Sequence, residues 1–180
     1  MKLNMRTNKG FTLLELMVVI AIISVLAGVL FNRVWFYQEQ AEKAAMEQVA
    51  GALQSALIMK YGRLLIDGKP ADVKSLVTEN PINWLMKQPP NYVGEYFAPT
   101  PGAISPGNWA FDLKNRELVY APAHVEYLVA NSNGYKWVRY RTHLQYEALA
   151  ASKDGKSLEL TSVLFEPVEP YQWMIKGNNE

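Results

Sequence analysis

The stretch of sequence that decides the fold is Lys9-Gly10-Phe11-Thr12-Leu13-Leu14-Glu15-Leu16-Met17-Val18-Val19-Ile20-Ala21-Ile22-Ile23-Ser24-Val25-Leu26-Ala27-Gly28-Val29-Leu30-Phe31. From Phe11 to Phe31 it has 21 residues, and only Thr12, Glu15 and Ser24 are polar. At about 1.5 Å rise per residue, a helix of this length is roughly 31 Å long, and a hydrocarbon core is about 30 Å thick. The stretch therefore predicts a helix that spans a membrane.

Three features distinguish this stretch from an ordinary signal sequence. The residues before Phe11 are polar and basic, a small residue (Gly10) precedes the apolar run, and a carboxylate (Glu15) lies inside it. A secretory signal has its small-residue cleavage site after the apolar segment. A charged side chain in a membrane helix costs about 2–3 kcal/mol on insertion scales. A plain membrane anchor gives no reason for Glu15.

The segment Lys9-Gly10-Phe11-Thr12-Leu13-Leu14-Glu15 resembles the cleavage and methylation motif of type IV prepilins and type II secretion pseudopilins. The resemblance implies that a prepilin peptidase cuts between Gly10 and Phe11 on the cytoplasmic side and N-methylates Phe11. It also implies that Glu15 is the carboxylate that docks one subunit onto the next in a filament.

The chemistry of the cleaved helix agrees with that expectation. Cleavage leaves an ammonium on Phe11, and a carboxylate in the first turn is favoured by the helix dipole. Two opposite charges in lipid are less costly as a pair than apart. Glu15 of one subunit is therefore expected to meet the Phe11 ammonium of its neighbour and to set the stagger between subunits. The plainer alternative is that Glu15 only compensates the dipole of its own helix.

Net charge and composition limit the classes of function that this chain can have. The formal net charge is +1, and removing a leader with three basic and no acidic residues lowers it to −2, which does not favour a nucleic-acid partner. The positive-inside bias keeps residues 1–10 in the cytoplasm and exports the rest. The chain has no Cys. Many type IV pilins close a C-terminal loop with a disulfide, so this chain departs from that pattern.

The apolar run is expected to continue into a single helix over residues 11–61, with residues 11–31 in the membrane. The predicted packing stripe comprises Ala41, Ala45, Val49, Ala52, Ala56 and Met59, broadened by Met46, Leu53 and Leu57. The opposite side carries Glu39, Lys43, Glu47, Gln54 and Lys60, with Glu39 and Lys43 spaced as an ion pair. Gly62 is the predicted stop.

The remaining residues, 62–180, are expected to form one globular domain. The predicted helical pieces are residues 71–78 and 82–86, followed by a Pro-rich loop over 91–106. The predicted strands are 109–113, 117–120, 125–130, 135–146 and 157–165, with a turn at Asp154-Gly155, a last edge segment at 171–175 and a frayed tail. The sequence thus predicts an α+β fold: a long N-terminal helix packed on an antiparallel sheet, as in pilins.

No motif in the sequence indicates an enzyme, a cofactor or a metal site. His124 and His143 lack metal-ligand spacing, and His124 is expected at the surface. The segment from Tyr135 to His143 alternates aromatic and basic residues. On a strand it would place Tyr135, Trp137, Arg139 and Arg141 on one face, which is a candidate ligand surface, for example for single strands. A solvated sheet face is the plainer interpretation.

The sequence therefore predicts a structural subunit, a minor pilin or pilin-like protein, of a type IV pilus-type filament. Its expected partners are prepilin peptidase, sibling subunits, and an inner-membrane platform with its ATPase. It is expected to reside in the bacterial inner membrane with a periplasmic globular domain, and then in a filament. Two alternatives remain: a pseudopilin of a type II secretion system, and a signal-anchored periplasmic binding domain that does not polymerise.

Overall fold

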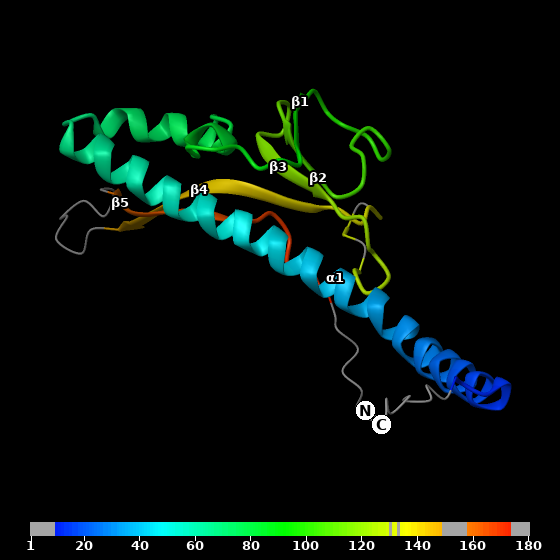
Figure 1. The fold of residues 1–180 in the computed structure, drawn as a ribbon. Coiled ribbons are helices and arrows are strands. Elements are labelled where there is room, and N and C mark those ends of the chain that lie inside the picture. Colours follow the sequence, from blue (N-terminus) through cyan, green and yellow to red (C-terminus); the bar gives the residue numbers. More distant parts are fainter. Residues whose placement is uncertain (1–9, 130, 133, 149–157, 174–180) are drawn as a thin grey trace, which may run out of the picture. The chain divides into compact units, whose positions relative to one another are not determined.

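The computed structural model describes residues 10–129, 131–132, 134–148 and 158–173. Its elements are α1 (Leu13–Ile66), the 3₁₀ segments η1 (Pro70–Val77) and η2 (Pro81–Trp84), and the strands β1 (Tyr92–Tyr96), β2 (Asn108–Asp112), β3 (Glu117–Ala121), β4 (Val138–Ala148) and β5 (Leu158–Pro167) (Figure 1). This α+β arrangement of a long apolar N-terminal helix and a five-stranded sheet confirms the predicted fold class.

Contacts group the chain into two compact units, Met1–Gln38 and Glu39–Glu180, and the boundary falls inside α1. We call the second the head unit. Among the described residues, α1 is the one helix long and apolar enough to cross a membrane, and none of its most apolar 18-residue window is buried. The hydroxyl of Ser24 donates to the carbonyl of Ile20 at 2.7 Å, so this polar group inside the apolar run has a partner within the helix.

α1 has 54 residues and runs past the predicted stop. Gly62 lies inside it, and the helix ends at Ile66 instead of Tyr61. The end is a Schellman motif: the Gly68 N–H donates to Leu65 and the Lys69 N–H donates to Leu64. Gly68 has φ +68°, the left-handed conformation that this motif requires. The stop signal is therefore Asp67-Gly68.

The two glycines predict opposite effects of substitution by Ala. Gly62→Ala should stabilise the head unit by about 0.5–1 kcal/mol, because Gly62 is in a helix interior with open space at its Cβ position. Gly68→Ala should destabilise it by about 1 kcal/mol, because its backbone is left-handed. Urea unfolding of the full-length chain in detergent measures both. Equal effects of the two substitutions would contradict this account of the helix end.

The sheet has the strand order β1-β2-β3-β4-β5. β2 and β3 correspond to the strands predicted at 109–113 and 117–120. They pair antiparallel, with Trp109 opposite Tyr120 and Phe111 opposite Leu118. β3 pairs with β4 and β4 with β5, both antiparallel. β4 begins at Val138 instead of Tyr135. The predicted Asp154-Gly155 turn and the tail after Trp173 lie outside the described residues.

Two predictions about the sheet are wrong. The Pro-rich segment 91–106, predicted as a loop, contains β1, which pairs in parallel with β2. Conversely, residues 125–129 form no strand, and only an isolated bridge joins Leu128 to Trp173. That bridge is also the only strand pairing that the described residues show for the predicted edge segment 171–175. β1 was not predicted because prolines flank it in the sequence. The strand at 125–130 was predicted from its apolar composition alone.

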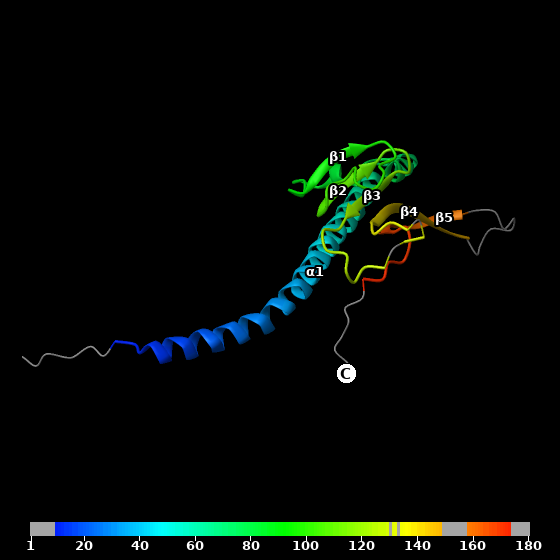
Figure 2. The ribbon, with the colours of Figure 1, turned by 90° about the vertical axis from the view of Figure 1, so that its right-hand side faces the viewer.

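The sheet lies on one side of the head part of α1, as Figures 1 and 2 show. The main core lies between them, and the segment with η1 and η2 runs beside the last turns of α1 (Figure 1). The short helical pieces predicted at 71–78 and 82–86 correspond to η1 and η2. The core side chains include Met46, Leu53, Leu57, Leu76, Ile82, Trp109, Phe111, Leu118, Tyr120, Val138, Tyr140, Val163 and Phe165. A smaller cluster of Ile104, Ala110, Val119 and Ala121 covers the opposite face of the sheet.

The buried face of α1 is rotated away from the predicted alanine stripe. Met46, Leu53, Ala56 and Leu57 are buried, whereas Ala41, Ala45, Ala52 and Met59 are exposed. The larger side chains determine the packed face because they remove more apolar area from water. Nothing in the described part of the head unit buries these exposed alanines.

Two polar side chains predicted to face solvent are part of the head interior. The Gln54 amide donates to the carbonyl of Val163 at 3.2 Å and accepts the Phe165 N–H at 2.5 Å. It thereby covers part of the outer edge of β5, where unpaired backbone groups would otherwise invite strand addition. Glu39 is also buried, and the expected Glu39–Lys43 pair is replaced by Lys43 with Glu47 at 3.7 Å.

Candidate functional site

The N-terminal motif adopts a defined helix start. Gly10 and Phe11 precede the helix and are exposed, and Thr12 is the cap residue. The Thr12 hydroxyl oxygen accepts the Glu15 N–H at 3.2 Å, and the Thr12 carbonyl accepts the Leu16 N–H at 3.1 Å. Thr-x-x-Glu is the spacing of a capping box, so Thr12 fixes the first turn and places Glu15 within it.

The Glu15 side chain is exposed, as are the apolar side chains that follow it. Phe11 is 76% exposed. Nothing in the described part of the chain covers this helix face. The arrangement leaves Gly10, Phe11 and Glu15 accessible to another protein.

Two carboxylates where α1 enters the head unit hold the segment between β3 and β4. Glu42 accepts the Tyr120 hydroxyl at 2.9 Å and the backbone N–H groups of Ala123 and His124 at 2.6 and 2.9 Å. Glu39 accepts the Tyr127 N–H at 3.0 Å and the Trp173 indole N–H at 2.6 Å. Hydrogen bonds to a carboxylate are among the stronger ones, so these two side chains tie loop and C-terminal segment to the helix.

His124 belongs to this cluster and is not the simple surface residue that was expected. Its Nδ1 lies 2.7 Å from Glu42 Oε2, and the side chain is half-buried. Burial raises the pKa of Tyr120 well above its usual range, and the nearby Glu42 acts in the same direction. Tyr120 therefore stays a hydrogen-bond donor. Sequence reasoning missed this cluster because it depends on contacts between residues about eighty positions apart.

The candidate ligand surface is divided by the structure. Tyr135 and Trp137 remain neighbours, with ring centroids 5.7 Å apart, but both precede β4. Arg139 and Arg141 lie on one face of β4, and both bind the buried carboxylate of Glu117 on β3. The two guanidinium groups are thus bound within the chain to a buried carboxylate.

Arg139 also reaches Glu169, with Nη2 2.5 Å from Oε1. The backbone N–H and hydroxyl of Ser132 hydrogen-bond the same carboxylate at 3.0 and 2.8 Å. These hydrogen bonds and the ion pair hold the pKa of the Glu169 carboxyl below its usual range. The Ser132 N–H has the largest effect, followed by the Ser132 hydroxyl and then Arg139. Glu169 therefore stays ionised beside Arg139.

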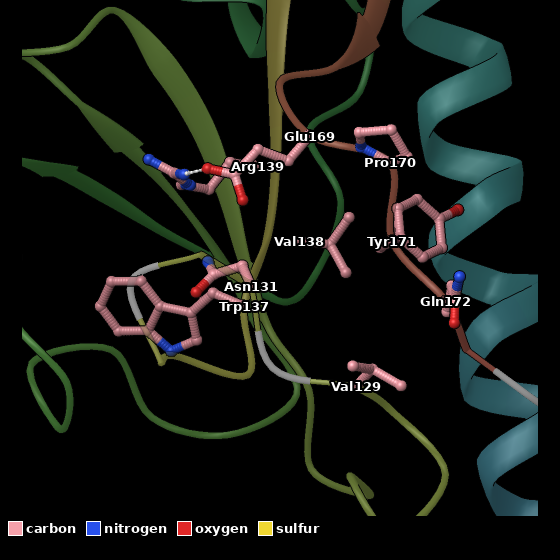
Figure 3. A pocket seen from close by; sticks show the side chains of 9 residues that line it. All are labelled: Val129, Asn131, Trp137, Val138, Arg139, Glu169, Pro170, Tyr171 and Gln172. Carbon is pink, nitrogen blue, oxygen red and sulfur yellow. Dashed lines mark hydrogen bonds and ion pairs between the residues drawn. The ribbon is translucent and has the colours of Figure 1, made fainter.

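A pocket of about 240 Å³ opens beside this ion pair, where the chain beyond β5 separates from the start of β4. Its floor and walls combine apolar and polar side chains, and Figure 3 shows them together. They are Val129, Asn131, Trp137, Val138, Arg139, Glu169, Pro170, Tyr171 and Gln172. Two of the four predicted surface residues, Trp137 and Arg139, line this pocket, and Tyr135 and Arg141 do not.

No group of three His, Cys, Asp or Glu side chains that could hold a metal ion occurs in the described ranges. The N-terminal motif on α1 and the pocket of the head unit are both open to other molecules.

A comparison with known protein families gives a match at the N-terminal motif. The family model described as the prokaryotic N-terminal methylation motif matches residues 5–31, which include Gly10, Phe11 and Glu15. No curated protein and no solved structure matches the chain. The motif, together with the long N-terminal helix and the mostly antiparallel sheet, supports a type IV pilin-like or pseudopilin protein. The apolar helix is consistent with anchoring in the inner membrane.

Proposed function

We propose that this chain is a structural subunit, a minor pilin or pilin-like protein, of a type IV pilus-type filament. The observation that carries the proposal is the methylation motif at the start of a helix whose apolar side chains are unburied. Prepilin peptidase removes residues 1–10 and methylates Phe11, and the mature helix then enters a bundle of sibling helices. The inner-membrane platform and its ATPase drive this assembly, with the head unit on the periplasmic side.

The geometry at Gly10 supports a role in processing. Gly10 does not have a left-handed φ, and a Cβ atom there would meet nothing within 4 Å. The chain itself therefore gives no reason for a glycine at this position. A peptidase that must approach the backbone closely gives one, because glycine has no side chain to obstruct it. Since the Gly10–Phe11 bond precedes the helix, cleavage leaves the Thr12 cap intact.

The cleaved terminus supports docking by Glu15. Thr12 caps the helix whether or not the leader is present, so Glu15 is not needed as the only stabiliser of the first turn. Its carboxylate is exposed and one turn from the new ammonium of Phe11. In lipid, pairing with the ammonium of a neighbouring subunit lowers the cost of both charges.

An uncharged face of α1 in the head unit gives further support. Its members recur with a seven-residue period over four repeats, and all are exposed except the half-buried Gly62. Ile58, Met59 and Ile66 are 54, 69 and 87% exposed, which is unusual for a soluble domain standing alone. We call it the uncharged face; it comprises Ala41, Ala44, Ala45, Gln48, Gly51, Ala52, Ser55, Ile58, Met59, Gly62, Leu65 and Ile66.

A seven-residue repeat of apolar residues is the pattern by which helices pair, and this face is apolar apart from Gln48 and Ser55. Beside the uncharged face, a groove of about 590 Å³ runs between residues 45–52 and the loop 85–91, with Trp109 and Tyr120 at its base. The occupant that fits both the uncharged face and the groove is the corresponding helix of a neighbouring subunit of the same kind. The opposite side of α1 already packs against the sheet of its own chain.

Met59→Glu tests the proposal by placing a charge in the middle of the uncharged face. Met59 is 69% exposed, so the head unit should fold and the leader should be removed as in the wild type. Incorporation into sheared filaments should fall about tenfold or more, since burying one unpaired carboxylate costs at least about 1.4 kcal/mol. Immunoblots of the sheared and membrane fractions measure the ratio.

The matched control is Tyr146→Glu, which adds the same charge at an exposed residue on β4. It should assemble normally. Normal assembly of Met59→Glu, or equal loss in both variants, would contradict a role of the uncharged face.

A pseudopilin of a type II secretion system is the second candidate. It is favoured by the absence of Cys, since this chain cannot form the C-terminal disulfide of many pilins. Deleting the gene separates the two: loss of enzyme secretion indicates a pseudopilin, and loss of twitching or adhesion indicates a pilus subunit.

A further inference from the structure

We propose that the pocket between Trp137 and Tyr171 binds a neutral saccharide ring. This site is separate from the N-terminal motif and from the uncharged face, so the proposal does not depend on filament assembly. The pocket has a balanced charge, rigid polar groups and aromatic walls.

The charged groups around the pocket cancel one another. Arg139 contacts both Glu117 and Glu169, and Arg141 contacts Glu117. Of these four residues, only Arg139 and Glu169 line the pocket, so one cation faces one carboxylate there and the lining carries no net charge. An anionic ligand would have to compete with carboxylates already bound to Arg139, and a cation would have to compete with the arginines. A neutral polar ligand meets neither obstacle.

The polar groups are held in place before any ligand arrives. Glu169 is fixed by Ser132 and Arg139, as described above. Asn131 is fixed because its Oδ1 accepts the Tyr135 N–H at 2.9 Å. Its amide nitrogen then lies on the side of the Arg139–Glu169 pair (Figure 3). Groups already ordered lose little conformational entropy on binding, so weak individual contacts can add up.

Several of these groups still have hydrogen-bonding capacity. In the described part of the chain, no hydrogen bond engages the Trp137 indole N–H, the Asn131 amide N–H₂ or the Gln172 side-chain amide. Oε1 of Glu169 already accepts from the Ser132 hydroxyl and from Arg139, whereas Oε2 accepts from the Ser132 N–H and can accept another hydrogen bond. The pocket therefore offers donors and acceptors in close succession, which matches adjacent hydroxyl groups on one ring.

The aromatic walls fit the apolar side of such a ring. Figure 3 shows Trp137 on one side of the pocket and Pro170 and Tyr171 on the other, with Val138 between them and Val129 below. Trp137 packs against the Ile104 cluster, and the Tyr171 hydroxyl lies 3.3 Å from the Tyr140 hydroxyl and donates to Glu47 at 3.2 Å, which steadies both rings. The electron-rich face of an indole attracts polarised C–H groups, such as those on one face of a sugar.

Size also selects a single ring. Sites for drug-sized ligands are about 300–1,000 Å³, so a pocket of about 240 Å³ admits a smaller molecule. A single-stranded nucleic acid needs a basic groove with stacking surfaces for several bases. Here the arginines are neutralised and one indole lines the pocket, which disfavours the single strands considered from sequence.

The test uses the full-length chain in lauryldimethylamine oxide, a detergent without a sugar headgroup. The probes are glucose, galactose, mannose, N-acetylglucosamine and N-acetylgalactosamine, at about 10 mM, tenfold above an expected Kd of about 1 mM. Saturation-transfer NMR detects bound sugar, and the indole N–H signals of the five tryptophans locate the site. Sorbitol, an open-chain polyol, and a thymidine oligonucleotide are the comparison ligands.

At least one of the sugars should give saturation transfer and shift the Trp137 indole signal, whereas sorbitol should not. Trp137→Ala should weaken binding about tenfold or more. Asn131→Asp should also weaken it, since the carboxylate keeps the acceptor for Tyr135 but loses the N–H₂ donors. Phe97→Ala, which removes an aromatic side chain 75% exposed and outside the pocket, should leave binding unchanged.

The proposal is overturned if no sugar binds to the folded chain, or if Trp137→Ala binds sugar as well as the wild type. It is equally overturned if the oligonucleotide shifts the Trp137 signal and the sugars do not. Retained tryptophan signal dispersion in each variant shows that the head unit is folded, so loss of binding cannot be attributed to unfolding. Failure here leaves the filament assignment intact, and failure of assembly leaves this proposal intact.

Discussion

Replacing Glu15 by Gln is expected to leave a processed, membrane-inserted protein that no longer enters filaments. The substitution keeps the size of the side chain and removes its charge, so the Phe11 ammonium of the neighbouring subunit loses its partner. An isolated charge in a membrane helix costs about 2–3 kcal/mol on insertion scales, less near the membrane edge. Because the same contact recurs at every subunit, a loss of this size should reduce incorporation by at least about a hundredfold.

The measurement compares subunit in sheared filaments with subunit in membranes. Ser24→Ala is the matched control: it removes another polar group from the apolar run, one whose hydroxyl is bound within the helix to Ile20. It should assemble normally. If Glu15 only compensated the dipole of its own helix, Glu15→Gln would cost about 0.3–1 kcal/mol and assembly would persist. Wild-type incorporation of Glu15→Gln would therefore contradict docking.

The largest effect on stability is expected at Glu117. Its carboxylate is 2% exposed and binds both Arg139 and Arg141. Glu117→Ala leaves two partly buried guanidinium groups without this partner, and breaking a buried pair in this way costs about 3–5 kcal/mol. That is a large share of the roughly 5–15 kcal/mol that stabilises a typical domain. Urea unfolding of the full-length chain in detergent, followed by tryptophan fluorescence, measures the change.

Glu126→Ala is the control for Glu117, since it removes an exposed carboxylate from the same head unit. Its effect should stay within about 0.5 kcal/mol, as for most surface substitutions. A cost below about 1 kcal/mol for Glu117→Ala would mean that water or rearrangement compensates the arginines, and the assignment of Glu117 as the centre of this cluster would be wrong.

Local signals accounted for the elements that the sequence predicted well. The apolar run and the packing stripe after it predicted α1, and the strands predicted at 109–113 and 117–120 correspond to β2 and β3. Such patterns depend on residues close together in the chain. β1 was not predicted because it is a short strand surrounded by prolines and glycines. Its backbone pairing with β2 forms only when the chain folds.

The polar interior was not predictable in the same way. Glu39 and Gln54 follow the spacing of a solvent-facing stripe, yet they bind Trp173 and β5, more than a hundred residues away. Arg139 and Arg141 were placed correctly on one face, but their partner Glu117 lies on another strand. A signal was present: Glu117 begins a strongly apolar strand, and a carboxylate there needs a cation from a neighbouring strand.

The pocket is a further consequence of contacts that sequence patterns do not reveal. Trp137 and Arg139 were singled out as part of an aromatic and basic stretch. The residues that complete the pocket, Glu169, Pro170, Tyr171 and Gln172, come from the segment after β5. They meet the start of β4 because Val168 continues the strand pairing with Arg139 before the chain turns away.

Mass spectrometry of the N-terminus of the protein from its native membrane tests the central claim most directly. We expect a mature chain that begins at Phe11 and carries an N-methyl group, because we propose that cleavage occurs between Gly10 and Phe11 within the matched motif. A chain that still begins at Met1, or that begins after Ala27 or Gly28, would contradict the filament assignment. It would instead favour an anchored or secreted domain.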